Sequence, residues 1–552
     1  MVFTRVDGPP RFVYRQRIRA EEAEGQQRVS DLRVLTDNQG STLSAMPRGT
    51  KNAPTTDFGK TVAEAYATSG AAIELGQAVH DGELIPGAEA KIPLKTMNRH
   101  GLIAGATGTG KTRTLQLIAE QLSAAGVAVF AADVKGDVSG ISTPGETGGP
   151  AEKRAAELGL TFTPIGYPVE YLSLGGIGPG VPVRATVSDF GPRLLAKVLD
   201  SNETQEQSLE LVFHYADAKG LPLLDLADLR ALLTFLVSDD GKTELEGIGG
   251  LASQTVGVLL RALVGLEDGG GNELFGEPQF DINDLIRTAS DGRGVISCLE
   301  LPAVQDKPRL FSTALMWLLA ELFETLPEVG DLEKPKLCFF FDEAHFLFDG
   351  ANKAFLESVT QTVRLIRSKG VGVFFITQTP KDLDPDVLGQ LGNRVQHALR
   401  AFTPDDAAAL KATVRTFPKS EFYDLEQLLQ QLGIGEAAVT ILSESGVPTP
   451  VVHTKLRPPL ARMAPADNVD AAAKASSLYA KYGARVDAQS AREMLAARIQ
   501  QTSGPEEKRD RAKAANATRS SDELGDFLKS RTGKQIQREV IRGVFGMLRK
   551  RL

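Results

Sequence analysis

Residues 99–112 read RHGLIAGATGTGKT, and this stretch decides the fold. A short apolar run at 102–104 leads into eight residues that match the pattern G-x-x-x-x-G-K-[ST] at every fixed position. These residues are Gly105, Ala106, Thr107, Gly108, Thr109, Gly110, Lys111 and Thr112. Glycines without a Cβ let successive backbone N–H groups point at phosphate oxygens, at the positive end of the following helix. The pattern therefore predicts a phosphate-binding loop, in which Lys111 reaches the β- and γ-phosphates and the Thr112 hydroxyl binds Mg²⁺.

The flanking residues favour such a loop over a chance glycine-rich turn. After the loop, apolar residues recur at helical spacing through Leu115, Ile118 and Leu122, and a buried-strand run follows at 127–132. Strand, loop, helix and strand at this spacing form a βαβ unit. We therefore predict an α/β fold with a P-loop core.

The composition is that of an ordinary globular chain. It has 552 residues and a formal net charge of −8, and this length predicts several domains or one large elaborated domain. The two cysteines, Cys298 and Cys338, lie in apolar runs and are interpreted as buried strand residues, not as a disulfide pair or a metal site. The most apolar helix, at 311–326, carries two glutamates and is too short for a membrane span. No secretory signal opens the chain, so we expect a cytoplasmic protein.

Five segments are predicted along the chain. They are a disordered extension at 1–60, the first part of the ATPase core at 61–187, a helical insertion at 188–290, the second part of the core at 291–464 and a basic tail, helical or partly disordered, at 465–552. The extension has no periodic pattern, so the translation start is either Met1 or Met46. The stretch 504–552 carries thirteen basic and seven acidic residues, and is either a solvated surface or a contact for nucleic acid.

A second motif ends a buried strand with two carboxylates. Five apolar residues at 337–341 precede Asp342 and Glu343, and ligands bind at the carboxyl edge of open α/β sheets. On its own this is an ordinary acidic strand end, but with a phosphate loop upstream we predict that Asp342 holds Mg²⁺. Glu343 would then take a proton from the water that attacks the γ-phosphate. Gln378 ends the next strand and is either a sensor of the γ-phosphate that orients the water or a turn residue.

Two arginines lie on the helix between these motifs. Arg364 and Arg367 are three residues apart and share one helical face, and position 363 holds a valine instead of an acid that could pair with Arg367. Two interpretations stay open for Arg367: an arginine that completes a neighbouring subunit's site, or a solvent-facing charge.

Taken together, these motifs resemble the HerA/FtsK-type motor ATPases, and more closely the bacterial YjgR-like proteins with a HerA-like helicase C-terminal domain. The resemblance rests on NRHGLIAGATGTGKT, FAADVKGDVSGIS, CFFFDEAHFLF, RLIRSKGVGVFFITQTP and LGNRVQHALRAFTPDD, and covers roughly residues 70–460. It implies a RecA-like core, a mostly parallel sheet flanked by helices, with an inserted helical subdomain and a helical tail. It further implies ATP and Mg²⁺ as cofactors and a hexameric ring. By the same resemblance, Arg367 matches an arginine finger, and Arg113 and Asp133 line the nucleotide site. A clear N-terminal β-barrel, present in the DNA-end-processing HerA proteins, is missing from the pattern.

The predicted function is therefore Mg²⁺-dependent ATP hydrolysis by a ring-forming DNA translocase or helicase. An alternative from another class is an ATP-dependent switch or assembly scaffold that acts on a protein partner without translocation. A GTPase is disfavoured because no N-K-x-D element is present to read the base. A small-molecule kinase is disfavoured because Glu343 beside Asp342 favours activation of water.

Overall fold

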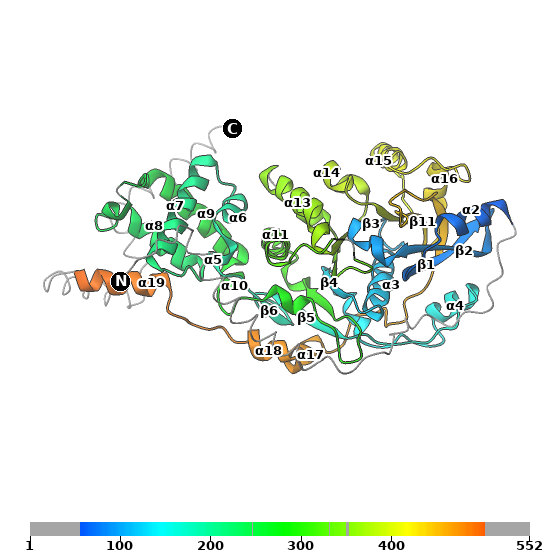
Figure 1. Ribbon diagram of the computed structural model, residues 1–552, viewed down its shortest axis with the longest axis horizontal. Coiled ribbons are helices and arrows are strands. Elements are labelled where there is room, and N and C mark those ends of the chain that lie inside the picture. Colours follow the sequence, from blue (N-terminus) through cyan, green and yellow to red (C-terminus); the bar gives the residue numbers. More distant parts are fainter. Residues whose placement is uncertain (1–55, 246, 331, 349–352, 503–552) are drawn as a thin grey trace, which may run out of the picture. The chain divides into compact units, whose positions relative to one another are not determined.

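The computed structural model describes residues 56–245, 247–330, 332–348 and 353–502. Their strands form a single twelve-stranded sheet, drawn in Figure 1. The strands are β1 (Ala72–His80), β2 (Glu83–Pro93), β3 (Gly101–Ala104), β4 (Ala128–Asp133), β5 (Val169–Leu174), β6 (Val181–Val183), β7 (Ile296–Glu300), β8 (Leu337–Phe341), β9 (Val371–Thr377), β10 (Asn393–Gln396), β11 (Glu436–Thr440) and β12 (Val452–Leu456).

The sheet has a parallel part and an antiparallel part. Its strand order is β2-β1-β12-β11-β10-β3-β9-β8-β4-β7-β5-β6. From β10 to β6 all neighbours are parallel, whereas β11, β12, β1 and β2 continue the sheet in antiparallel pairs. Because parallel strands end at the same edge, the loops after β3, β9, β8, β4 and β7 meet at one carboxyl edge.

The central strands are apolar on both faces. All residues of β8 and β4 are buried, which is typical of parallel strands covered by helices on both sides. On one face, Cys338 and Phe340 share a core with Leu115 and Ile118 of the helix that follows the phosphate loop. On the other face, Phe339 packs against a neighbouring ring of β4 at a centroid distance of 4.6 Å. Both cysteines are free and buried in strands, as predicted.

Helices cover the sheet on both sides. The helices that accompany it are α2 (Asp57–Ala65), α3 (Lys111–Ala124), α4 (Pro150–Glu157), α11 (Pro308–Thr325), α12 (His345–Phe348), α13 (Lys353–Ile366), α14 (Pro385–Leu388), α15 (Pro404–Val414) and α16 (Leu425–Gln431). Figure 1 shows α3 on one side of the central strands and α11 and α13 on the other. The predicted α/β class, a mostly parallel sheet flanked by helices, is confirmed.

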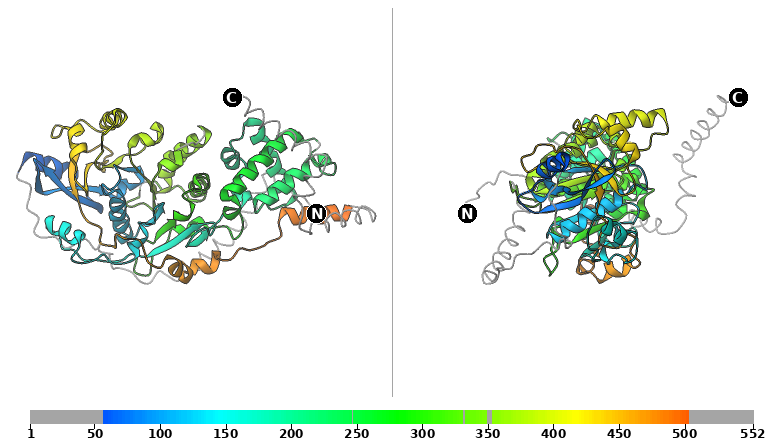
Figure 2. Two further views of the ribbon diagram at one scale, coloured as in Figure 1. Left: turned by 180° about the vertical axis from the view of Figure 1, so that it is seen from behind. Right: turned by 90° about the vertical axis from the view of Figure 1, so that its right-hand side faces the viewer.

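Between β6 and β7 the described residues form helices and no named strand. These helices are α5 (Val187–Phe190), α6 (Pro192–Val198), α7 (Glu203–Lys219), α8 (Leu226–Leu236), α9 (Ser253–Leu266) and α10 (Asn272–Leu274). Helix α7 is capped at both ends, by a capping box at Asn202 and by Gly220 in the left-handed conformation. Helix α9 contacts both α7 and α8, and the three helices form one group in the views of Figures 1 and 2.

After β12 the chain crosses the helix of the phosphate loop. Glu120 of α3 is buried and accepts N–H groups from Leu460 and Ala461, so this crossing segment is fixed to α3. Burial raises the pKa of Glu120 to about 8. Helices α17 (Val469–Ala475) and α18 (Ser477–Tyr482) then contact β5 and β6 respectively.

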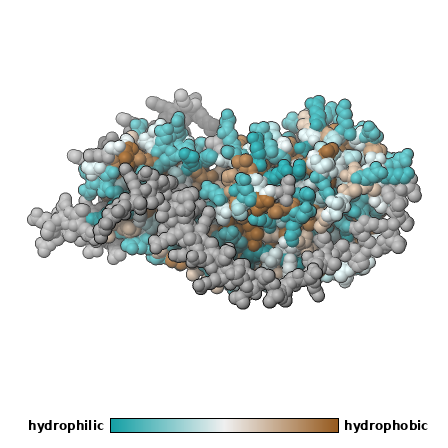
Figure 3. Space-filling view, viewed as in Figure 1, coloured by the Kyte–Doolittle hydropathy of each residue, from teal (hydrophilic) through white to brown (hydrophobic). Residues whose placement is uncertain are grey.

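The chain divides into two compact units, residues 1–488 and 489–552. The second contains α19 (Ala491–Thr502). Of the predicted basic tail, residues 503–552 lie outside the described residues, as does most of the predicted N-terminal extension. No helix in the described ranges is both long and apolar enough to cross a membrane. On the face shown in Figure 3, hydrophilic residues separate smaller hydrophobic patches.

Candidate functional site

The phosphate loop joins β3 to α3 and forms the floor of the candidate site. Gly110 is the N-cap of α3 with a backbone φ of 114°, and Gly108 has a φ of 78°. Residues other than glycine rarely adopt these backbone conformations. A Cβ built at Gly108 would meet no atom within 4 Å, so the loop is open on that side. Thr112 lies half-buried in the first turn of α3. The loop therefore presents backbone N–H groups at a helix N-terminus, the geometry that binds anions.

Lys111 is folded back onto its own loop. Its Nζ donates hydrogen bonds to the carbonyl oxygens of Gly105 at 2.7 Å and Ala106 at 3.3 Å. Burial lowers the pKa of this ammonium, while the charges of Glu343 and Asp342 act in the opposite direction. The lysine thus occupies a site that favours an additional anionic partner.

Two segments distant in sequence hold the loop from outside. His397 is fully buried beneath it and its Nε2 lies 2.9 Å from the Thr114 hydroxyl of α3. Burial lowers the pKa of His397 to about 4, with the nearby Lys111 charge as a smaller cause. On another side, the N–H of Gly435 donates to the carbonyl of Thr109 at 3.0 Å. These supports were not predicted, because neither residue is close to the loop in sequence.

Asp342 and Glu343 follow β8, at the same edge as the phosphate loop. Asp342 is 2% exposed and its Oδ2 has no hydrogen-bond partner. Burial raises the pKa of Asp342 to about 7, and the neighbouring carboxylate of Glu343 adds to the shift. Glu343 has a positive φ of 47°, rare for a residue that is not glycine and typical of functional sites. Its Oε1 pairs with Lys135, and its Oε2 lies 3.3 Å from His345 Nδ1.

Asp133 ends β4 and closes a tight loop. Its two carboxylate oxygens accept N–H groups from Gly136 at 2.7 Å and Val138 at 2.8 Å. Burial raises the pKa of Asp133 to about 6, against the opposing effect of the Val138 N–H. Arg113 of α3 reaches the same loop and donates to the Asp137 carbonyl at 3.5 Å. The side chain of Asp133 therefore shapes the loop that borders the site.

Three carboxyl groups come together where a divalent cation would fit. Oxygens of Asp133, Asp137 and Asp342 lie within 4.8 Å of one another, across the β4–β8 pair. Mg²⁺ prefers carboxylate and hydroxyl oxygens. Two buried oxygens of this group, Oδ2 of Asp342 and Oδ1 of Asp137, have no hydrogen-bond partner, and a bound cation would provide one.

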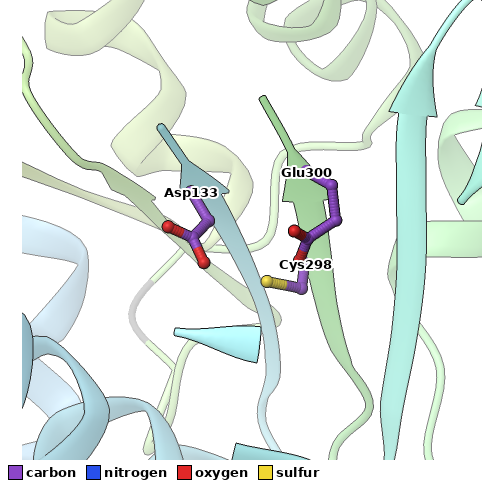
Figure 4. A group of neighbouring side chains, drawn as sticks. All are labelled: Asp133, Cys298 and Glu300. Carbon is purple, nitrogen blue, oxygen red and sulfur yellow. The ribbon is translucent and has the colours of Figure 1, made fainter. Parts of the chain in front are cut away.

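A second group of side chains lies one strand further. Asp133 on β4 and Cys298 and Glu300 on β7 point toward one another, as Figure 4 shows. Burial raises the pKa of Glu300 to about 8, and the charge of Asp133 adds to it, so Glu300 keeps its proton at neutral pH. Both oxygens of Asp133, which belongs to both groups, already accept backbone N–H groups, whereas Oδ2 of Asp342 has no hydrogen-bond partner.

Gln378 follows β9, the strand between β3 and β8. Its side chain is exposed and borders a cavity of about 480 Å³, whose lining also includes His345, Phe348, Thr379 and Asp382. The loop after β9 is fixed by Asp382, which accepts from the Thr377 hydroxyl at 2.8 Å and from the Thr379 N–H at 2.9 Å. Gln378 is thus placed at the shared edge, between the phosphate loop and the carboxylates.

Arg367 lies at the other end of the same strand. It begins a short 3₁₀ turn, η7 (Arg367–Lys369), just before β9. Its charge acts on the buried His100, which precedes β3, and the pKa of His100 is lowered to about 4, mainly by burial. Seven residues of β9, at ~3.3 Å each, separate Arg367 from Gln378 by about 23 Å. The fold therefore does not bring Arg367 into the site of its own chain.

A comparison with protein families gives one assignment. The family model described as Helicase HerA-like C-terminal matches residues 80–544, which include the phosphate loop, the Asp342–Glu343 pair and Gln378. The chain belongs to this family. Within the HerA-like match lie the whole parallel sheet and the helical segment between β6 and β7. The predicted resemblance is thereby confirmed.

A comparison with solved structures matches, among others, a plasmid coupling protein and a VirB4 protein. The plasmid coupling protein TrwB in complex with ADP and Mg²⁺ is 15% identical, covers 77% of this chain and 97% of its own, and has a TM-score of 0.48. VirB4 of Thermoanaerobacter pseudethanolicus is 15% identical, covers 70% of this chain and 97% of its own, and has a TM-score of 0.45. No curated protein matches the sequence of this HerA-like chain.

Proposed function

We propose that this HerA-like chain is a Mg²⁺-dependent ATPase that works as a ring-forming motor on DNA. The observation that carries the proposal is the convergence of three features on one sheet edge: an open phosphate loop, a buried carboxylate pair and a glutamine between them. Anion-binding N–H groups next to unpartnered carboxylates fit a nucleotide together with a divalent cation.

Each residue receives a role from its position. The N–H groups of the loop hold the phosphates, and Lys111 exchanges its loop carbonyls for β- and γ-phosphate oxygens. Thr112 and Asp342 would hold Mg²⁺, which supplies positive charge to the β- and γ-phosphates when bound. Arg113, from α3, and Asp133, from the end of β4, would border the nucleotide.

Hydrolysis requires a base and an orienting group. Glu343 lies at the same carboxyl edge of the sheet as the phosphate loop, and its carboxylate takes the proton of the attacking water. Gln378 orients that water or senses the γ-phosphate. The position of Glu343 directly after Asp342 supports attack by water on the γ-phosphate over transfer of the phosphoryl group to another acceptor.

Compartment and partners follow from the same proposal. Two free, buried cysteines and a dependence on ATP fit a cytoplasmic protein. DNA as the substrate is supported by the family, whose description names a helicase. A ring of identical subunits, six in number by the family resemblance, is supported by the distance of Arg367 from its own site.

The ATPase assignment is tested by two variants with different expected defects. Lys111→Ala should weaken ATP binding ~10- to 100-fold, because a charge-assisted contact of ~1.5–3 kcal/mol is lost. Glu343→Gln should keep ATP binding while turnover falls ~10²- to 10⁴-fold, because the amide keeps the shape but accepts no proton. Binding is measured by calorimetry and turnover by phosphate release. An unchanged ATP affinity of Lys111→Ala would contradict the assignment of the phosphate loop as the ATP site. Loss of ATP binding in Glu343→Gln would show that Glu343 has a structural role.

The DNA substrate is tested by turnover with single- and double-stranded DNA side by side. A translocase should hydrolyse ATP several-fold faster with at least one of them, and the stimulation should fade as salt weakens the phosphate contacts. The Glu343→Gln protein serves as the control that binds ATP but does not turn it over. A rate that is indifferent to both DNA forms at low salt favours the switch or scaffold that acts on a protein partner.

The ring is tested by mixing two inactive proteins. Arg367→Ala should keep folding and ATP binding but lose ~10³- to 10⁵-fold in turnover, because a guanidinium supplied by the neighbour stabilises charge on the γ-phosphate. Mixed with Lys111→Ala protein, it should regain activity, since some junctions combine an intact Lys111 with an intact Arg367. Arg364→Ala, on the same helix, is the matched control and should stay active. If mixed rings form and remain inactive, Arg367 does not act across the boundary.

A further inference from the structure

Lys135 contacts the proposed base directly. It follows β4, and its Nζ donates a hydrogen bond to Glu343 Oε1. The Glu343 side chain is 5% exposed, whereas that of Lys135 is 47% exposed. The hydrogen bond and charge of Glu343 outweigh the burial of the ammonium and raise the pKa of Lys135. A half-exposed lysine is thus bound to a buried carboxylate at the carboxyl edge.

The loop that carries Lys135 is fixed on both sides. Asp133, two residues before the lysine, accepts N–H groups from Gly136 and Val138, which follow the lysine in sequence. Before it, the carbonyl of Val134 accepts from the side-chain amide of Gln305 at 2.5 Å. Because the backbone is held, the reach of the lysine side chain is set by the fold, not by a freely moving loop.

The contact also determines which oxygen of Glu343 is available. Oε1 is occupied by Lys135, while the buried Oε2 forms no hydrogen bond with the described residues and lies 3.3 Å from His345 Nδ1. The backbone of Glu343 is fixed as well, because the next residue, Ala344, donates its N–H to the Ile376 carbonyl at 2.8 Å. The carboxylate is thereby held at Oε1 by a hydrogen bond, whereas none of the described residues donates a hydrogen bond to Oε2.

Like charges surround this carboxylate. Asp342 is its neighbour in sequence, and Asp137 also acts on the Lys135 ammonium from the same side. Without a cation at Oε1, a buried carboxylate among others would turn away from them or toward solvent. The ammonium of Lys135 offsets this repulsion at Oε1, so that Oε2 stays available to accept a proton from the attacking water.

We propose that Lys135 is the positioning residue of the base: it holds Oε1 of Glu343 so that Oε2 faces the attacking water. This rests on the proposed ATP hydrolysis and adds a residue to it. In this role Lys135 acts through Glu343 and contributes to the chemical step, whereas a lysine that binds phosphate directly would contribute to ATP binding as well.

The test is a double-variant cycle on turnover and ATP affinity. Lys135→Met, which keeps the length of the stem, should lower kcat ~10²-fold, the effect of a misplaced catalytic group, with KM and ATP affinity within about twofold. Lys135→Arg should recover part of the loss, because it restores a cation. Lys153→Met, on the exposed side of α4, is the matched control and should behave as wild type. In the Glu343→Gln background, Lys135→Met should cause almost no further loss.

Other outcomes separate the alternatives. If Lys135→Met lowers ATP affinity to the same extent in both backgrounds, the lysine acts on the phosphates and the positioning role is wrong. If kcat is unchanged while the wild type is active, the contact has no part in the reaction. A wild type without any ATP turnover contradicts the proposed function itself, and the positioning role with it.

Discussion

The site depends on the cost of gathering buried carboxyl groups at one edge of the sheet. Asp133, Asp137 and Asp342 approach within 4.8 Å, and Glu343 adjoins them. The pKa of Asp342 is raised from 3.8 to about 7, a shift worth on the order of 4 kcal/mol against the ionised form. Such a cost persists in a folded protein when a ligand repays it, and a divalent cation with its phosphates is the partner that these oxygens suit.

The parallel sheet brings these charged residues together. Parallel strands β3, β9, β8, β4 and β7 end together, so whatever follows each strand shares the edge with the others. The cations are distributed over separate elements: Lys111 begins α3 and Lys135 follows β4. Each is anchored by its own loop, Lys111 by loop carbonyls and Lys135 through the turn that Asp133 closes. Both ammonium groups interact electrostatically with Asp342, but neither forms a hydrogen bond with its Oδ2, which stays unpartnered.

The two ends of β9 carry two residues of the proposed mechanism, Gln378 and Arg367. Gln378 lies at the carboxyl edge with the phosphate loop, while Arg367 precedes the strand, about 23 Å away by strand length. A residue at the far edge can reach a phosphate loop only if that loop belongs to another subunit. In the proposed ring, the amino edge of one subunit's sheet would therefore face the carboxyl edge of the next subunit's sheet.

Local patterns predicted the parts of the site that depend on neighbours in sequence. The phosphate loop, the buried strand before Asp342 and the free cysteines follow from short motifs and apolar runs. Contacts between distant segments were not predictable: His397 beneath the loop, Gly435 against Thr109 and Lys135 on Glu343 depend on how the strands are ordered. The D-x-x-G-D spacing of the loop after β4 did carry a local signal, since a carboxylate that accepts N–H groups three and five residues on is a turn pattern.

The antiparallel half of the sheet shows the same limit. The place of strands β1 and β2 at the edge of the sheet was not predicted. Strand β1 pairs with β12, from Gly76 to Leu456, and such long-range pairing leaves no periodic mark in the sequence. The proposed role of Arg367 belongs to this class as well, because it would depend on a partner subunit.

The most direct test of the charge constraint is the unfolding midpoint of Asp342→Asn relative to wild type. In EDTA the variant should melt higher, and the gain should be larger at pH 8 than at pH 5. The reason is that the folded pKa of about 7 exceeds the ordinary 3.8, so the wild type loses stability as pH rises through this range. With saturating Mg²⁺ and ADP the order should reverse, because Asp342 then has its cation. A variant that melts lower than wild type in EDTA at both pH values would contradict the account.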